Sequence, residues 1–315
     1  MTTFPQIIFV AGPTASGKSF LAVEIADFLQ KKFVQGSEII NADAIQLYNE
    51  LKILTAFPSD DQMKRVRHNL FGILSPNDSS SVAVWLKMAS EEIKRIWTEQ
   101  NVAIICGGTG FYLKAVTDGI AVIPEVPAEI RQQVRDRFAK IGCDAFFEEL
   151  KKIDPESQLP PGDTQRLLRA YEIALFTGKS LSHWWKSQHK SQQQDFRTLS
   201  IVLNPPRPAL QQVCSSRIQS MMEAGAMEEV RDFQKRYENY SGPLVNAVGY
   251  KEITAFLKCE MSREECIEKM CVRTRQYAKR QSTWFRNQMK NAWFLNDFGH
   301  KSETINVVTQ NIDNS

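Results

Sequence analysis

The sequence offers little cysteine chemistry. Its six cysteines are scattered through 315 residues, and no two of them are spaced as Cys-x-x-Cys. None of the four histidines stands in metal-ligand register with them. A zinc site built from cysteine and histidine requires such spacing. We therefore expect reduced, mostly buried thiols and no zinc.

Long apolar runs are also missing. No stretch approaches the roughly 20 residues that a membrane-spanning helix needs, and the start of the chain lacks the charged and apolar regions of a secretory signal. We expect a cytoplasmic protein with no membrane partner. The formal net charge of +3 is too small to indicate a nucleic-acid partner by itself, so that indication must come from where the charges lie.

What is present is an alternation of short apolar strands with amphipathic helices. Helical periodicity covers residues 18–31 and 82–100, and strands are predicted at 6–11, 38–42, 101–106 and 198–203. This alternation predicts an α/β fold, a P-loop NTPase-like parallel sheet flanked by helices on both faces. Ligands of such sheets bind beyond the carboxyl ends of the strands.

The sequence pattern changes after residue 125. Charged helical stretches replace the strands there and continue to a polar run at 186–195. We predict three parts: residues 1–125 as the first part of the core, 126–196 as an all-helical insertion domain, and 197–315 as the second part of the core with basic C-terminal helices. The polar tail after Phe298 is expected to be loosely held.

A phosphate-binding loop opens the chain. The pattern G-x-x-x-x-G-K-S stands between a predicted strand and a predicted helix, in the residues Gly12, Pro13, Thr14, Ala15, Ser16, Gly17, Lys18 and Ser19. Backbone N–H groups and the helix N-terminus attract an anion, Lys18 adds a full charge, and the Ser19 hydroxyl can ligate Mg²⁺. The loop predicts a diphosphate or triphosphate site, and whether ATP also enters it stays open.

One acid stands where it could act on that phosphate. Strand 101–106 runs into glycine and strand 198–203 into asparagine, so only Asp43 follows a strong apolar strand. A carboxylate there could hold Mg²⁺ through water or act as general base toward an acceptor beside the phosphates. The pattern favours a transferase over a motor ATPase.

A basic run near the C-terminus supplies the charge asymmetry that the net charge hides. Residues 269–296 contain seven lysines and arginines and no acid, with aromatic residues interleaved. The cations are typical of phosphate contacts in nucleic-acid binding, whereas we expect the aromatic rings to pack in the core.

The joint order of six motifs resembles the bacterial tRNA dimethylallyltransferases, also called tRNA isopentenyltransferases, over nearly the whole chain. The motifs are residues 12–19, 41–48, 107–112, 163–172, 247–252 and 274–286. The resemblance implies transfer of a dimethylallyl group from dimethylallyl diphosphate to N6 of the adenosine 3′ to the anticodon, position 37, in tRNAs that read codons starting with U. The products are N6-(dimethylallyl)adenosine and diphosphate.

The same resemblance assigns roles to residues. It implies that Asp43 is the base, and that Lys18, Thr109 and Arg131, with Mg²⁺ on Ser19, stabilise the leaving diphosphate. It implies an insertion domain that contacts tRNA, with the anticodon stem-loop as partner of a monomeric enzyme. The implied tRNA contacts are Asp43, Ala44, Ile45, Gln46, Gln165, Arg166, Leu167, Leu168, Arg169, Lys251, Lys279, Arg280 and Arg286.

The chain departs from the family pattern in two places. Ala44-Ile45 stands where the family usually has Ser-Met, which removes a hydroxyl beside the base. Arg67-His68 replaces the usual His-His, so we assign His68 no catalytic role.

Two alternative functions stay open. A P-loop kinase or an adenylate isopentenyltransferase of the cytokinin type would use the same loop and Asp43 on free nucleotides. A non-catalytic RNA-binding module would use the basic run alone. The first needs neither the insertion nor the basic run, and the second needs no P-loop.

Overall fold

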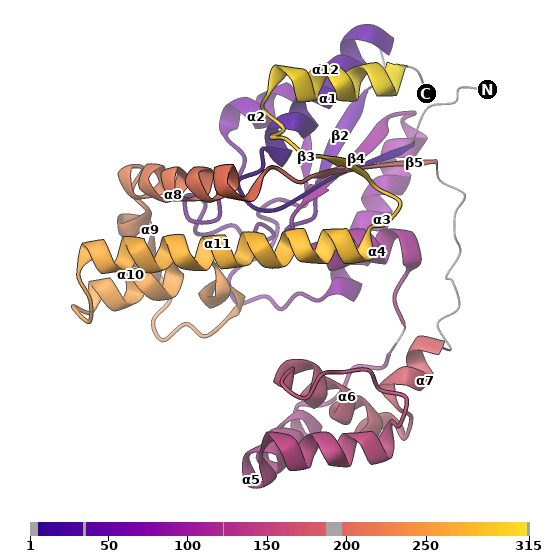
Figure 1. Cartoon of the computed structure of the whole chain (residues 1–315), viewed down its shortest axis with the longest axis vertical. Coiled ribbons are helices and arrows are strands. Elements are labelled where there is room, and N and C mark those ends of the chain that lie inside the picture. The colour runs from indigo at the N-terminus through magenta and orange to yellow at the C-terminus, as the bar shows by residue number, and fades with distance from the viewer. Residues whose placement is uncertain (1–5, 34–35, 122, 187–196, 314–315) are drawn as a thin grey trace. The chain divides into compact units, whose positions relative to one another are not determined.

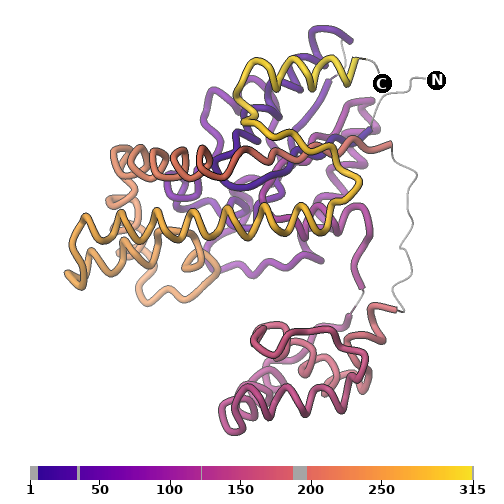
Figure 2. Tube along the Cα trace, in the orientation of Figure 1, coloured from indigo at the N-terminus to yellow at the C-terminus, as the bar shows by residue number. Residues whose placement is uncertain are grey.

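The computed structural model describes residues 6–33, 36–121, 123–186 and 197–313. The chain forms two compact units, the first made of Met1–Thr117 and Gln194–Ser315 and the second of Asp118–Gln193. The chain therefore leaves the first unit once and returns to it (Figures 1 and 2). Within the described ranges, none of the helices has the length and apolar character needed to cross a bilayer.

The first unit is built on a six-stranded sheet in which every pairing is parallel. In spatial order its strands are β3 (His68–Asn69), β2 (Ser37–Asn41), β4 (Val102–Gly107), β1 (Ile7–Ala11), β5 (Thr198–Leu203) and β6 (Trp293–Leu295). The predicted α/β fold is confirmed. Two strands, β3 and β6, were not predicted because two or three residues are too few to show a period.

Helices cover both faces of this sheet (Figure 1). One set of alternating strand residues, including Ile8 and Val10, packs against α1 (Lys18–Phe33) and α12 (Ser302–Asp313). The other set, including Ile7 and Phe9, belongs to a larger core on the opposite face. That core includes residues of α3 (Val82–Thr98), α4 (Gly110–Asp118), α8 (Arg207–Glu223), α9 (Ala226–Arg236), α10 (Tyr250–Leu257) and α11 (Arg263–Gln288). Two short helices, α2 (Asp60–Arg65) and a 3₁₀ turn at Pro243–Asn246, complete the unit.

The C-terminal tail corrects one prediction. Residues after Phe298 were expected to be loosely held, but Ser302–Asp313 forms α12, whose Val308 and Ile312 are fully buried against α1. These two side chains are four positions apart, so they lie on one helical face. The polar residues between them lower the overall hydropathy without removing that face.

The second unit is all-helical within its described residues. It contains α5 (Ala128–Ile153), α6 (Thr164–Thr177) and α7 (Leu181–Lys186), around a small core of its own. Gly142 breaks α5 with a left-handed φ of 78°. Asp163 caps α6 by accepting a hydrogen bond from the backbone of Arg166, and Gly178 ends it in the left-handed conformation. Most of the predicted polar run at 186–195 lies outside the described residues.

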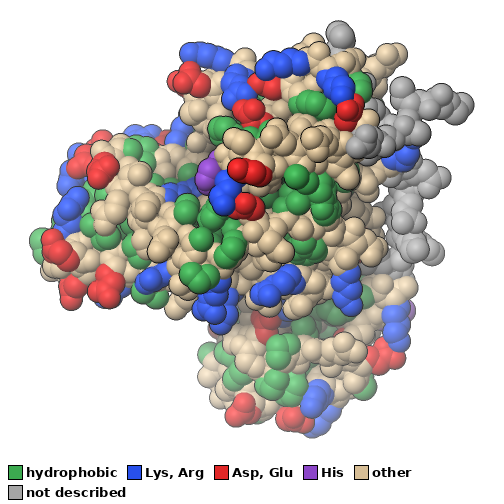
Figure 3. Space-filling view, turned by 45° about the horizontal axis from the view of Figure 1, so that its top comes forward, with side chains coloured by type: hydrophobic (Ala, Val, Ile, Leu, Met, Phe, Trp, Pro, Cys, Tyr) green, Lys and Arg blue, Asp and Glu red, His purple; other side chains and the backbone are tan. Residues whose placement is uncertain are grey.

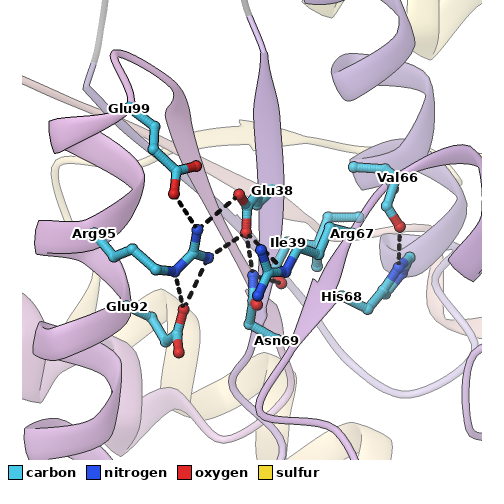
Figure 4. A network of polar contacts seen from close by, with 9 residues as sticks. All are labelled: Glu38, Ile39, Val66, Arg67, His68, Asn69, Glu92, Arg95 and Glu99. Carbon is cyan, nitrogen blue, oxygen red and sulfur yellow. Dashed lines mark hydrogen bonds and ion pairs between the residues drawn. The ribbon is translucent and has the colours of Figure 1, made fainter.

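An ion-pair network ties the sheet to α3 near the start of β2 (Figure 4). The Glu38 carboxylate is 6% exposed and accepts hydrogen bonds from Arg95 of α3 and, at 2.8 Å, from Asn69 of β3. Arg67 adds a longer ion pair at 3.6 Å. Burial opposes the charge on Glu38, but the hydrogen bonds from Arg95 and Asn69 outweigh it, so the pKa of Glu38 lies below its usual value.

We expect Glu38→Gln to lower the free energy of unfolding at neutral pH by roughly 1–3 kcal/mol, because it removes charge-assisted hydrogen bonds. A carboxylate with a depressed pKa stabilises the fold above its unfolded-state pKa, and this contribution disappears as the pH falls through the folded-state pKa. The difference in the free energy of unfolding between wild type and Glu38→Gln should therefore disappear below about pH 4.5. Urea unfolding at several pH values measures this difference, with substitution of the more exposed Glu99 by glutamine as the control. A gap that is constant with pH would contradict this.

Candidate functional site

The P-loop lies where the sequence predicts it, between β1 and α1. Gly12 has a φ of 145°, and a Cβ there would approach the Leu203 carbonyl oxygen to 2.7 Å. Gly17 has a φ of 88°. The hydroxyl of Ser16 is buried and has no hydrogen-bond partner among the described residues. A tightly curled loop with an unpaired buried hydroxyl is suited to an anion.

Lys18 lies over this loop, and its ammonium donates a hydrogen bond of 2.8 Å to the Pro13 carbonyl. Burial lowers the pKa of Lys18 to about 8, and the positive charge of Arg217 also lowers it, while Cys106 and Asp43 act in the opposite direction. The Ser19 hydroxyl contacts the thiol of Cys106 at the end of β4, and burial raises the pKa of that thiol to about 11. Cys106 is therefore a neutral, structural neighbour of the site.

Asp43 stands in a turn that directly follows β2. Asn41 holds this turn: its Oδ1 accepts from the Asp43 backbone at 2.8 Å, and its Nδ2 donates to the Asp43 and Leu70 carbonyls at 3.0 Å each. One carboxylate oxygen of Asp43 accepts the Ile45 N–H at 3.0 Å. The other lies 3.8 Å from where a Cβ on Gly108 would stand. The turn thus fixes the carboxylate toward the loop after β4.

The glycine-rich loop after β4 approaches its neighbours too closely for other residues. A Cβ on Gly107 would lie 2.1 Å from the Ala42 carbonyl oxygen, and one on Gly110 would lie 2.1 Å from the Trp284 ring. Thr109 ties the loop to the Asp43 turn, since its Oγ1 accepts the Ala44 N–H at 3.1 Å. Thr109 therefore positions the backbone beside Asp43.

Gln281 of α11 joins this loop to the P-loop. Its Oε1 accepts the Thr14 N–H at 2.8 Å, and its Nε2 donates to the Gly108 carbonyl at 2.9 Å. The side chain is 6% exposed. This role was not predicted, although Gln281 lies within the basic run and is an uncharged polar residue on the buried side of its helix.

Two further residues at the site were missed. Arg217 of α8 donates to the Thr14 hydroxyl at 3.4 Å, and its pKa is lowered by burial while Cys214 and Asp43 raise it. Tyr277 of α11 has a pKa raised first by burial and then by the charge of Asp43. No motif singled out Arg217, because a lone arginine in a helix carries no spacing signal.

The site therefore combines groups from five elements of the first unit. They lie in direct contact or within electrostatic range of one another, and they are the P-loop with Lys18, the Asp43 turn, Thr109, Arg217 and Gln281. Two cations beside an anion cradle and one oriented carboxylate are able to stabilise a leaving phosphate and accept a proton.

The predicted RNA contacts of the first unit have varied surroundings. Gln46 uses its Nε2 to hold the Thr55 and Ala56 carbonyls at 2.9 Å each. Ala44 and Ile45 are half-buried and pack against the core. The exposed cations are Lys251 on α10 and Lys279, Arg280 and Arg286 on α11. Of the aromatic residues in the basic run, Phe285 is 1% exposed and Trp284 packs against the same core.

The remaining predicted residues belong to the second unit. Gln165 and Arg166 are exposed on α6, Arg169 is half-buried, and Leu167 is fully buried in the unit's core, against which Leu168 packs. Arg131 lies in the first turn of α5, 3.7 Å from Glu125, and its Nε is buried with no partner among the described residues.

The family model and the relatives with the most similar sequences indicate the same family. Residues 46–288 match the family model described as IPP transferase. The chain is 42% identical over 287 residues, 90% of its length, to a protein of Phenylobacterium zucineum named tRNA dimethylallyltransferase, of which it covers 91%. A relative of the same name from Paramagnetospirillum magneticum is 42% identical over 290 residues, 91% of this chain and 90% of that one.

Solved structures give the same result. The crystal structure of a tRNA isopentenylpyrophosphate transferase from Bacillus halodurans superposes with a TM-score of 0.71 at 28% identity, covering 98% of this chain and 96% of that one. A eukaryotic dimethylallyltransferase described as acting on tRNA gives a TM-score of 0.79 at 25% identity, covering 98% and 79%.

Proposed function

The chain belongs to the IPP transferase family, and on that premise we propose that it moves a dimethylallyl group from dimethylallyl diphosphate to tRNA. It is a transferase that prenylates tRNA. The proposed acceptor is N6 of adenosine 37, 3′ to the anticodon, in tRNAs that read codons starting with U. The observation that supports it best is the oriented Asp43 carboxylate beside the P-loop cations.

The proton of the acceptor goes to Asp43. The N6 lone pair of adenine is delocalised into the ring and is a weak nucleophile, so a base must remove a proton as the bond forms. The new C–N bond forms at the allylic carbon while its C–O bond breaks, and diphosphate leaves with the electron pair. The Asp43 carboxylate is oriented for the role of base, because the Ile45 N–H fixes one of its oxygens and leaves the other facing Gly108.

The negative charge that develops on the leaving diphosphate meets fixed donors. The P-loop backbone, Lys18 and Arg217 are already held in place by Pro13 and Thr14, so little reorganisation is needed during the reaction. Thr109 and Gln281 hold the two loops in register. We propose that Arg131 of the second unit also contacts the diphosphate.

The donor chemistry fits Mg²⁺. The Ser19 hydroxyl is a hard oxygen donor, while no group of three His, Cys, Asp or Glu among the described residues could hold a metal alone. Such a site suits a cation that takes most of its ligands from phosphate and water. When bound, Mg²⁺ supplies charge neutralisation for the diphosphate.

The proposed tRNA contacts include exposed cations of the first unit and polar or basic residues of the second unit. Lys279, Arg280 and Arg286 project from α11, and Gln165, Arg166 and Arg169 lie on α6 of the inserted helical domain. Basic and acidic side chains are interspersed on the face seen in Figure 3, so recognition by local clusters fits better than recognition by overall charge. The proposed working form is a cytoplasmic monomer that binds the anticodon stem-loop.

A transfer assay with two acceptors tests the proposal. The full chain is incubated with labelled dimethylallyl diphosphate, Mg²⁺ and either unmodified tRNA or AMP. We expect label in tRNA and at most about one part in a hundred of that rate with AMP, since AMP lacks the remote contacts that supply binding energy. Preferential labelling of AMP would instead establish the adenylate isopentenyltransferase alternative.

A further inference from the structure

The loop of residues 51–57 is held by a carboxylate from a distant helix. Glu229 lies in the first turn of α9, and its two carboxylate oxygens accept the consecutive N–H groups of Ile53 and Leu54 at 2.9 and 3.0 Å. These bonds span 176 and 175 positions of sequence. Two neighbouring N–H groups that point at one anion form a nest, and a carboxylate in a nest makes charge-assisted hydrogen bonds. Glu229 therefore fixes the backbone of this loop with two strong bonds.

The same loop is wound tightly on itself. The Thr55 N–H donates to the Leu51 carbonyl at 2.9 Å. Leu51 and Ala56 have left-handed φ angles of 56° and 51°, which residues with a side chain keep only where their surroundings hold them. Leu51 and Leu54 are buried in the core of the first unit. Apolar contacts thus anchor the loop on one side, and Glu229 supplies the polar anchor.

The loop in turn orients the side chain of Gln46. The carbonyls of Thr55 and Ala56 both accept from Gln46 Nε2, at 2.9 Å each. Since carbonyl oxygens cannot donate to an amide oxygen, this pair of acceptors selects one orientation of the side-chain amide. The amide nitrogen is thereby occupied, and Oε1 is left as the acceptor that Gln46 can offer to a partner. Gln46 is one of the proposed tRNA contacts, so the loop determines which atom faces the RNA.

The neighbouring acid shows what Glu229 would do as a helix residue alone. Glu228 lies in the same first turn of α9, is exposed, and forms an ion pair of 3.9 Å with Arg231. Both acids interact favourably with the positive end of the helix dipole. Glu229 differs in that its carboxylate also holds the loop. Comparing the two residues therefore separates the loop contact from the stability of the helix.

We propose that Glu229 is a positioning residue for the RNA substrate, because it holds the loop that orients Gln46. It acts on transfer through Gln46 and does not itself contact the reacting groups. The inference rests on the proposed function, since the orientation of Gln46 affects transfer only when the acceptor is RNA. Sequence motifs did not indicate Glu229, because a single acid at the start of a helix has an ordinary structural role.

Steady-state transfer of labelled dimethylallyl groups to unmodified tRNA tests the proposal in a double-mutant cycle of the full chain. We expect Glu229→Ala and Gln46→Ala each to raise the KM for tRNA by about three- to tenfold, which corresponds to the loss of one hydrogen bond. The kcat and the affinity for inorganic diphosphate should change little. The double variant should be no worse than Gln46→Ala alone, because the two residues act as a unit.

Two further variants and one structural measurement complete the test. Glu229→Gln keeps one acceptor and should have a KM between those of wild type and Glu229→Ala. The matched control, Glu228→Ala, should have the KM of wild type. Hydrogen exchange of residues 51–57, followed by mass spectrometry without substrate, should be faster in Glu229→Ala than in wild type or Glu228→Ala, since two N–H groups lose their acceptor.

Four results would each overturn the proposal: additive losses in the double variant, equal KM values in Glu228→Ala and Glu229→Ala, a parallel loss of diphosphate affinity in Glu229→Ala, or unchanged hydrogen exchange. If Glu229→Ala does not fold, Glu229→Gln replaces it in every comparison. A wild-type protein that does not modify tRNA would refute the proposed function itself. Additive losses in variants of an active wild type would refute this inference alone.

Discussion

Replacing Asp43 with alanine should reduce the rate of prenyl transfer to tRNA by about 10²–10⁴-fold, the usual contribution of a positioned general base. The physical reason is that the exocyclic amine cannot form the new bond without losing a proton, and Asp43 is the acid whose carboxylate faces both the P-loop cations and the glycine-rich loop. Single-turnover transfer of labelled dimethylallyl groups at saturating substrate measures the effect on the chemical step alone.

Asp43→Asn is the matched control for the structure of the turn. An asparagine side chain can still accept the Ile45 N–H with its amide oxygen, so the turn should persist while the basic group is lost. We therefore expect Asp43→Asn to be as slow as Asp43→Ala and to bind dimethylallyl diphosphate nearly as wild type does. An Asp43→Asn variant with wild-type rates would show that Asp43 orients the loop and does not act as the base.

Lys18→Ala should reduce transfer by about 10²–10³-fold and weaken binding of dimethylallyl diphosphate, because it removes a fixed charge from the leaving group. The matched control is Lys31→Ala, which removes the same charge from the exposed last turn of the same helix. Equal losses in the two variants would mean that the effect comes from net charge and not from the cradle.

The lowered pKa of Lys18 predicts that the affinity for diphosphate depends on pH. A lysine with a pKa of about 8 loses its charge as the pH rises through that value. We therefore expect the affinity of the free enzyme for inorganic diphosphate to fall by up to about tenfold between pH 7 and pH 9, and the Lys18→Ala variant to lack this component. The comparison needs only binding measurements at each pH.

Local patterns in the sequence were enough to predict the parallel sheet and its flanking helices. Four strands are short apolar runs that end at recognisable motifs, and buried strands of a parallel sheet have that composition. Because residues that follow such strands gather at one edge of the sheet, the P-loop, Asp43 and Thr109 could be placed near one another in advance.

Contacts between distant segments could not be predicted in the same way. Gln281 reaches Gly108 across 173 positions of sequence, and Trp284 fills the space that Gly110 leaves open. Arg217 reaches Thr14 from α8, over 203 positions. These pairs depend on the packing of α8 and α11 over the sheet, and packing leaves no period in the sequence.

The identity of the atom that receives the prenyl group tests the proposed function most directly. Unmodified tRNA is treated with the enzyme, dimethylallyl diphosphate and Mg²⁺, digested with nucleases, and its nucleosides and fragments are analysed by mass spectrometry. We expect one dimethylallyl group on N6 of the adenosine 3′ to the anticodon, formed about 10²–10⁴-fold more slowly when Asp43→Ala replaces the wild type. A prenyl group on another nucleotide, or on free nucleotides alone, would contradict the proposed function.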